Sequence, residues 1–392
     1  MKVAIFVTDD LTEHNAASLL VNEPLKHLVK FKDLEIHLIA PNDIPDELKN
    51  GLIYIRYTQY NKPILRFLSA FSAIPKLLRE DCDLYHVVGP KAASVLLIAS
   101  RIRRKKSSIL YEGFEVVGSI DLEPKITGRR TLKNKILGYF FDFRRDIALR
   151  HSDGLIVRAE GYKDFILKHD LYKKKIFVIP YAVNSEFFGR NYKKDLTLVN
   201  KLGLKDKKVI MYTGEITPLH GVLDLVKATE IINTKIEDVA LVIVGDGFWA
   251  PMIKEYVRKK LLNNIIFTGR VSHKKIPYYH SIADVLVIPH VRRLDSELLY
   301  PTKLLECLAS GKPIVASNLK AIADVVGDNA ILVEPENPQA FAEGILKLLN
   351  NEELAKRMGE NGKKIVRNYS WEETAKKTYE AYKDLLSSGN QI

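Results

Sequence analysis

The segment Pro301–Ser317, PTKLLECLASGKPIVAS, carries consecutive signals for a helix, a tight turn and a buried strand. A proline suits the first turn of a helix because its missing N–H would have no partner there. Leu304 and Leu308 repeat at helical spacing, and Gly311 can adopt the left-handed conformation that ends a helix. The apolar residues 313–317 then follow as a short strand. The segment therefore predicts one helix-to-strand step of a parallel α/β sheet.

Two charged side chains, Lys303 and Glu306, fall within the first turns of this predicted helix. A helix N-terminus binds anions, and one carboxylate can accept hydrogen bonds from two hydroxyl groups of a ribose. Lys303 and Glu306 could therefore bind a phosphate and a ribose together. The alternative is that Glu306 is a solvated glutamate on a surface helix.

The composition fits a chain with two cores of ordinary size, because 46% of its 392 residues are hydrophobic. The two cysteines, Cys82 and Cys307, are far apart and not in metal-ligand spacing. We therefore expect a reducing, cytoplasmic location and no structural zinc. We expect neither a signal peptide nor a membrane span, because the apolar runs are too short. A net charge of +12 indicates an anionic partner.

Short apolar runs alternate with segments of helical periodicity along the chain. The runs that predict strands are residues 3–8, 35–40, 52–57, 83–88, 108–111, 154–157, 176–179, 209–212, 240–244, 265–267, 285–288, 314–316 and 331–333. This alternation predicts the α/β class with doubly wound, Rossmann-like parallel sheets. Proline and polar residues interrupt it at 180–188, which places a boundary between domains 1–185 and 186–370.

Two basic stretches lie in the first half, Arg101–Lys106 and Arg129–Arg150. In the second stretch, apolar side chains that include Phe143 and Ile147 fall on one helical face, with lysines and arginines around it. Such a helix could lie on an anionic membrane surface, or its apolar face could simply cover the sheet.

The loops that follow the second-half strands are candidates for one site, because ligands of such sheets bind beyond the carboxyl ends of the strands. Gly214 would let the backbone approach a ligand closely, and His220 could donate to a phosphate near a helix start. Arg270 follows another strand, and its guanidinium can bind two phosphate oxygens. His220 and Arg270 could also be ordinary loop residues.

Together these segments resemble the retaining GT-B-fold glycosyltransferases of the family 4, or glycosyl transferases group 1, type. The resemblance rests on six segments in order: PYAVNSEFF, YTGEITPLHGVLDLVKA, LVIVGDGFW, IIFTGRVSHKKIPYYHSIADVLVIP, PTKLLECLASGKPIVAS and YSWEETAKKTYEAYKDLL. The first half is similar only in layout. The resemblance implies two Rossmann-like domains facing across a cleft, with a C-terminal helix, residues 371–392, that crosses back to the first domain.

The resemblance also implies that the second domain binds a UDP- or GDP-linked sugar as co-substrate, with no other cofactor and no metal ion. Glu306 would bind the ribose, the loop 214–221 and the helix N-terminus would bind the diphosphate, and the backbone near Arg270 would contact the base. The implied donor-binding residues are Gly214, Glu215, His220, Gly221, Arg270, Val271, Pro301, Thr302, Lys303 and Glu306.

Three positions depart from the family pattern. Glu215 and His220 replace an arginine and a lysine, and Leu298 replaces a second glutamate. A carboxylate beside a diphosphate repels it unless it is turned away or protonated. Other cations would then have to neutralise the phosphates: Arg270, Lys303 or Arg292.

A histidine that the family often places after the strand near residue 111 is replaced here by Tyr111-Glu112-Gly113-Phe114-Glu115. Glu112 or Glu115 could take its place, receiving the acceptor's proton or stabilising positive charge at the anomeric carbon. Both could equally be loop carboxylates.

We therefore predict an enzyme that transfers a sugar, with retention, from a nucleotide-sugar to a hydroxyl group of a glycan or lipid-linked acceptor. It would act in the cytoplasm or on the inner face of the cell membrane, contacted through Arg101–Lys106 and Arg129–Arg150. The alternatives are a GT-B nucleotide-sugar epimerase and a non-catalytic scaffold that binds glycan or nucleic acid. We expect no nucleic acid, because the aromatic residues of 129–150 share the apolar stripe.

Overall fold

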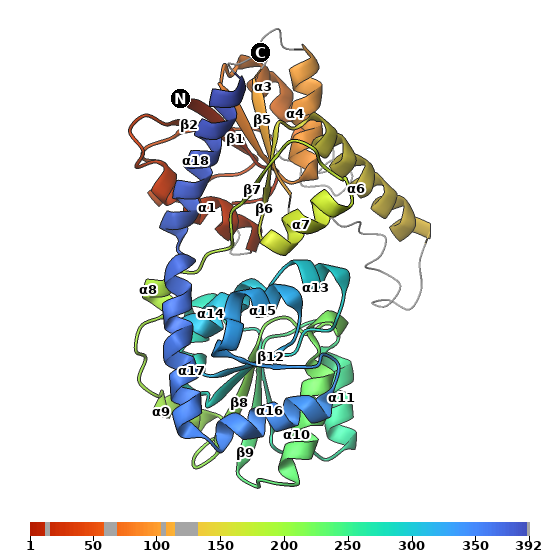
Figure 1. The fold of residues 1–392 in the computed structure, drawn as a ribbon, viewed down its shortest axis with the longest axis vertical. Helices are drawn as coiled ribbons and strands as arrows, with labels where there is room; N and C mark the ends of the chain where they lie inside the picture. Colours follow the sequence, from red (N-terminus) through yellow and green to blue (C-terminus); the bar gives the residue numbers. More distant parts are fainter. Residues whose placement is uncertain (12–15, 59–68, 103–106, 114–131, 390–392) are drawn as a thin grey trace. The chain divides into compact units, whose positions relative to one another are not determined.

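A computed structural model describes residues 1–11, 16–58, 69–102, 107–113 and 132–389. The chain divides into two compact units. Unit 1 comprises Met1–Tyr181 with Trp371–Ile392, and unit 2 comprises Ala182–Ser370. The division falls a few residues before the expected boundary at 185, and the last helix belongs to unit 1 (Figure 1).

Unit 1 is built on a seven-stranded parallel sheet with the strand order β3-β2-β1-β4-β5-β6-β7. Its strands are β1 (Lys2–Phe6), β2 (Glu35–Ala40), β3 (Ile53–Arg56), β4 (Leu84–Val88), β5 (Ser108–Glu112), β6 (Gly154–Val157) and β7 (Lys175–Val178). β4 and β6 are buried along their whole length, as apolar runs in a sheet covered on both faces should be.

The helices of unit 1 cover that sheet. They are α1 (Ala16–Leu28), α3 (Ile74–Arg79), α4 (Pro90–Ile102), α6 (Leu132–His151), α7 (Glu160–Lys168) and α18 (Trp371–Gly389). α18, from the end of the chain, lies beside α1 from its beginning (Figure 1). The Tyr379 ring stacks on Phe31 with centroids 4.1 Å apart, and the Tyr382 hydroxyl lies 2.8 Å from His86 Nδ1 in the core. α18 is therefore an integral part of unit 1.

Unit 2 contains a six-stranded parallel sheet with the order β10-β9-β8-β11-β12-β13. Its strands are β8 (Lys208–Thr213), β9 (Val239–Val244), β10 (Ile265–Gly269), β11 (Val285–Ile288), β12 (Ile314–Ser317) and β13 (Ile331–Val333). The order reverses between β8 and β11, so this is the point at which such sheets bind ligands. The expected α/β class with two doubly wound sheets is confirmed.

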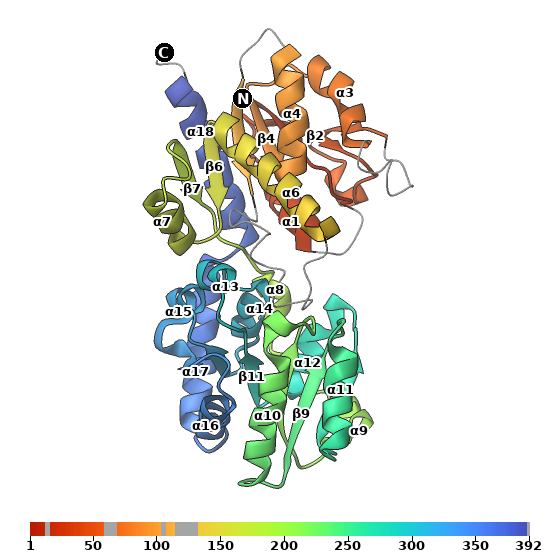
Figure 2. The same cartoon turned by 90° about the vertical axis from the view of Figure 1, so that its right-hand side faces the viewer.

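Helices cover both faces of the second sheet as well (Figure 2). They are α8 (Ser185–Phe188), α9 (Leu196–Lys201), α10 (Val222–Asn233), α11 (Ala250–Lys259), α12 (Ile276–Ile282), α13 (Leu294–Leu298), α14 (Thr302–Ser310), α15 (Lys320–Val326), α16 (Pro338–Leu349) and α17 (Glu352–Ile365). The core side chains come from β8, β9 and β11 and from the inner faces of α10 and α16.

The basic stretch Arg129–Arg150 forms α6 from Leu132 onward, and its first residues lie outside the described part. α6 packs on α4, and Ala148 and Leu149 are buried at its C-terminal end. Tyr139 and Phe143, one turn apart, are 64% and 60% exposed. The exposure of Phe143 contradicts, at that residue, the alternative in which the whole apolar face of the helix covers the sheet. Of Arg101–Lys106, residues 103–106 lie outside the described part. No helix within the described ranges is long and apolar enough to cross a membrane.

Glycines allow the loops at the carboxyl edge of the second sheet to approach one another closely. Gly221 has a φ of 61°, and a Cβ added there would lie 1.6 Å from the Pro289 carbonyl oxygen. A Cβ on Gly245 would lie 1.8 Å from the Gly214 carbonyl oxygen. The loops after β8, β9 and β11 thus meet at distances that only glycine permits.

Gly221→Ala should lower the free energy of unfolding by roughly 2–5 kcal/mol, because a left-handed backbone costs about 1–2 kcal/mol and an overpacked contact about 1–3 kcal/mol. The matched control is Gly203→Ala, which has a φ of 63° but no atom within 4 Å of the added Cβ. Gly203→Ala should lower the free energy of unfolding only by the cost of the left-handed backbone. Urea unfolding of both variants measures the difference, and equal losses would contradict the close approach at Pro289.

Candidate functional site

The candidate site lies at the carboxyl edge of the second sheet, around the N-terminal half of α14. Pro301 precedes the helix in an extended conformation and has no side-chain acceptor to cap it, and Gly311 ends it with a φ of 73°. One face of α14 is apolar and buried, with Leu304 and Leu308 among its residues. The opposite face carries the polar side chains of the site.

Lys303 packs onto the turn after β8. Its Nζ donates to the Tyr212 hydroxyl at 3.0 Å and lies 4.4 Å from the centre of that ring. The Tyr212 hydroxyl in turn donates to the Glu215 carbonyl at 2.5 Å. A Cβ on Gly214 would lie 2.8 Å from Nζ. Burial lowers the pKa of Lys303 to about 7, because its effect outweighs the opposing charges of Cys307, Glu306 and Glu215. The ammonium form is therefore only partly compensated for its loss of water.

His220 ends a short 3₁₀ turn, Pro218–His220, ahead of α10. Its Nδ1 lies 2.8 Å from Thr217 Oγ1, and its ring meets that of His290 edge-on at 4.9 Å between centroids. Burial, aided by the charge of Lys303, lowers the pKa of His220 to about 3. At neutral pH His220 is therefore an uncharged hydrogen-bonding group and does not supply the positive charge of the lysine that it replaces.

Glu306 lies one turn after Lys303 and contacts a residue that the sequence analysis did not identify. His273 Nε2 is 2.7 Å from Glu306 Oε1. The Glu306 side chain is 19% exposed and that of His273 is 48% exposed. The hydrogen bond to Glu306 raises the pKa of His273. The His273 ring also lies 5.2 Å from that of Phe188. No spacing or motif marked His273, since its partner is 33 residues away in the chain.

The remaining donor-site candidates lie on the surface of the same edge. Glu215, Arg270 and Thr302 are exposed, and Pro301 and Val271 are half-buried. The Glu215 carbonyl is used by Tyr212, while its side chain extends into solvent.

Arg292, one of the three cations considered for the phosphates, is bound elsewhere. Its guanidinium contacts Glu297 at 3.0 Å and Glu334 at 2.9 Å. Glu297 also accepts a hydrogen bond from the Lys320 N–H at the start of α15, whereas Leu298 is buried. The charge of Arg292 is therefore already matched, which leaves Lys303 and Arg270 as the candidate cations.

In unit 1, Glu112 lies at the end of β5 and is buried, so it is not a loop carboxylate. It forms an ion pair with Arg158 and lies 3.0 Å from His86 Nε2. Burial, together with the charge of Arg158, lowers the pKa of His86 to about 3. A cavity of about 20 Å³ adjoins Glu112, with Thr374 and other residues of α1 and α18 in its wall. Glu115 lies outside the described residues.

The contact between His273 and Glu306 predicts a pH dependence of stability. Folding raises the pKa of His273 above its ordinary value of 6.5. The stabilisation that the protonated His273 gives the folded protein is therefore complete below pH 6.5, and it is lost as the pH rises through the raised pKa. His273→Gln should therefore lower the melting temperature most below pH 6.5 and least above pH 8. Melting curves between pH 5.5 and 8.5 test this. In a Glu306→Gln background the pH-dependent part of the difference should vanish; its persistence would contradict the assignment.

Family models match both halves of the chain. Residues 196–365 match the model described as "Glycosyl transferases group 1", and residues 20–187 match "Glycosyltransferase Family 4". Together the two models account for most of the chain.

Several related proteins match this chain over most of its length and most of their own. An uncharacterized glycosyltransferase of Methanocaldococcus jannaschii is 26% identical over 92% of this chain and 93% of its own. A capsular polysaccharide biosynthesis glycosyltransferase of Staphylococcus aureus, CapM, is 26% identical over 86% of each chain. The Anabaena protein HepE, solved in complex with UDP, superposes with a TM-score of 0.72 at 17% identity over 98% of this chain and 100% of its own. The chain belongs to the GT-B glycosyltransferases, with a Family 4 domain in its first half and a group 1 domain in its second.

Proposed function

We propose that this glycosyltransferase transfers a hexose-type sugar from a nucleotide-sugar to a hydroxyl group of a glycan or lipid-linked acceptor, with retention of anomeric configuration. The observation that carries the proposal is the pairing of Lys303 with the Gly214 turn and of Glu306 with His273 on one face of α14. This face lies where the strand order of the second sheet reverses. The UDP in the complex of HepE, a protein of the same fold, supports a uridine nucleotide as donor.

The donor would lie across the first turns of α14. Glu306 keeps a second carboxylate oxygen in addition to the one that faces His273, and the carboxylate can accept from the ribose hydroxyls. Lys303 and the N-terminus of α14 would bind the diphosphate beside Gly214, where an added Cβ would lie 2.8 Å from the Lys303 amine. Val271 and the backbone beside Arg270 would contact the base, and exposed Arg270 is free to turn toward phosphate oxygens.

Charge stabilisation would supply the main catalytic effect. As the glycosidic bond breaks, negative charge grows on the departing diphosphate, and in the proposed binding mode the Lys303 amine and the N-terminus of α14 would stabilise that charge. The half-buried environment of Lys303 strengthens this interaction, because a partly desolvated charge pair is weakly screened. No metal ion is needed in this scheme.

The acceptor side of the reaction is assigned to unit 1. Glu112 or Glu115 would receive the acceptor's proton or stabilise positive charge at the anomeric carbon. Since Glu112 is held by Arg158 and His86, proton transfer to it must compete with an ion pair. Stabilisation of charge, or orientation of His86, suits Glu112 better.

We also propose that α6 makes peripheral contact with an anionic membrane. Tyr139 and Phe143 are exposed aromatic side chains one turn apart, and Arg144 and Arg150 lie on the same helix. An aromatic pair flanked by basic residues is the pattern of a helix that lies in a membrane interface. A lipid-linked acceptor would be reached from that position.

Glu306→Ala should weaken the binding of UDP about 10- to 150-fold, because a hydrogen bond to a charged group contributes about 1.5–3 kcal/mol. Isothermal titration with UDP and with GDP measures the loss and also identifies the base. The control is Glu255→Gln on the exposed face of α11, where Glu255 pairs with Arg258. An unchanged affinity in a folded Glu306→Ala variant would contradict the donor site.

Donor binding should also take up a proton through Lys303. With its pKa lowered to about 7, most of the amine is neutral at pH 8. A bound diphosphate would restore the charge with an uptake of up to about 0.9 proton, and close to none at pH 6. Titration of UDP-glucose in buffers of different ionisation enthalpy measures the uptake. Lys303→Arg, whose side chain is always charged, should bind without it. Equal uptake by this variant would assign the proton to another group.

A further inference from the structure

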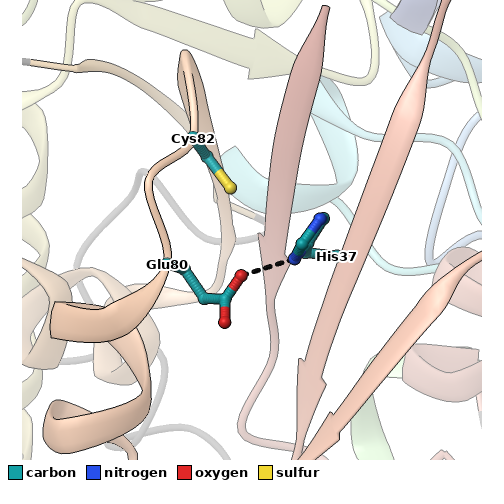
Figure 3. Close-up of side chains that lie close together, drawn as sticks. All are labelled: His37, Glu80 and Cys82. Atoms are coloured by element: carbon teal, nitrogen blue, oxygen red, sulfur yellow. Dashed lines mark ion pairs between the residues drawn. The ribbon is translucent and has the colours of Figure 1, made fainter.

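Three side chains with metal-binding atoms converge in unit 1, on the β2 side of the sheet (Figure 3). His37 lies in β2, Glu80 follows α3, and Cys82 precedes β4. One atom from each, the His37 imidazole nitrogen, a Glu80 carboxylate oxygen and the Cys82 sulfur, lies within 4.8 Å of the other two. The segments are far apart in sequence, so the fold alone brings the three together.

The imidazole of His37 is buried, and Glu35 holds its orientation by a contact with one ring nitrogen. Its Nε2 lies 2.6 Å from Glu35 Oε1, and the His37 side chain is 5% exposed. A carboxylate on one ring nitrogen fixes the ring and makes the other nitrogen a better ligand, as in carboxylate–histidine–zinc arrangements. The nitrogen so presented is Nδ1, which points toward Glu80 and Cys82.

The environment of Nδ1 is poorly explained by hydrogen bonding. Glu80 Oε2 lies 2.5 Å away, yet Nδ1 is a buried nitrogen without a hydrogen-bond partner of suitable direction. The close contact between this nitrogen and the Glu80 oxygen is therefore not a well-directed hydrogen bond. Cys82 is fully buried beside them as a thiol rather than a disulfide.

We propose that His37 Nδ1, a Glu80 oxygen and the Cys82 sulfur bind one zinc-class divalent ion, with Glu35 as the carboxylate behind the histidine. Nitrogen, oxygen and thiolate together are the ligands that zinc accepts, at about 2.0–2.3 Å, and a water would complete four-coordination. Binding converts the Cys82 thiol to a thiolate and releases one proton to solvent. His37 and Glu80 would move apart by less than about 1 Å to admit the ion.

Two of the four side chains in the proposal, Glu35 and Glu80, are accessible to solvent. Glu35, whose side chain is 56% exposed, lines an open surface depression of about 610 Å³ together with Asp83 and Lys2. The Glu80 side chain is 18% exposed. The bound ion would join β2 to the connection between α3 and β4 and so stabilise unit 1. The proposal does not depend on the nucleotide-sugar site, which lies in unit 2.

Cobalt(II) tests the ligand set directly, because a cobalt–thiolate bond gives a near-ultraviolet charge-transfer band. Titration of the untagged full chain should produce this band with one equivalent of Co²⁺, and added Zn²⁺ should remove it. The chain has one other cysteine, Cys307, in unit 2, which provides the matched control. Cys82→Ser should abolish the band and Cys307→Ser should leave it unchanged. The proposal would be overturned if the native sequence gave no band. It would also be overturned if Cys307→Ser abolished the band while Cys82→Ser kept it.

Zinc affinity tests the outer carboxylate. Zn²⁺ alone should raise the melting temperature of the native chain, because an ion that binds only the folded form stabilises it. Glu35→Gln, at a side chain that is 56% exposed, should weaken Zn²⁺ binding about 10- to 100-fold, and His37→Gln should remove it. If Zn²⁺ leaves the melting temperature unchanged, the cluster is a histidine between two carboxylates and no metal site.

Discussion

The amine of Lys303 lies in the space that a side chain at position 214 would need, and the chemistry proposed for unit 2 depends on this packing. Gly214 brings the backbone of the β8 turn against α14, and Tyr212 fixes the amine from below. The same crowding removes water from the ammonium group and lowers its pKa. The same packing thus fixes the position of the Lys303 amine and leaves its positive charge only partly neutralised. A diphosphate is the kind of ligand that would complete that neutralisation.

The strands were largely predictable from the sequence, whereas the short helix α9 was not. β2, β6, β11 and β13 have the bounds that their apolar runs predicted, because buried parallel strands are continuous apolar segments ended by turn residues. α9 lies within the polar, lysine-rich residues 192–206. Its start is capped by the Asp195 side chain, which accepts a hydrogen bond from the Leu198 N–H. Helices of a few residues are stabilised by such contacts rather than by periodicity.

The candidate site was predictable only where a residue acts through its position in the chain. Lys303 and Glu306 stand at a helix start, and that position alone suggested a phosphate and a ribose. Two other contacts form only when the chain folds, because each joins segments that are far apart in sequence. They are the contact of His273 with Glu306 and the pairing of Glu112 with Arg158 and His86. The same holds for the cysteine of unit 1, whose neighbours in sequence suggested no metal.

Unit 1 is assembled from the first and the last parts of the chain, which imposes an order on biosynthesis. The sheet of unit 1 is complete long before α18 exists, and His86 lacks the Tyr382 hydroxyl during that interval. At about 5–20 residues per second, synthesis of the intervening unit takes roughly 10–40 s. For that time the side chains that α18 later covers, Phe31 and His86 among them, lack this cover.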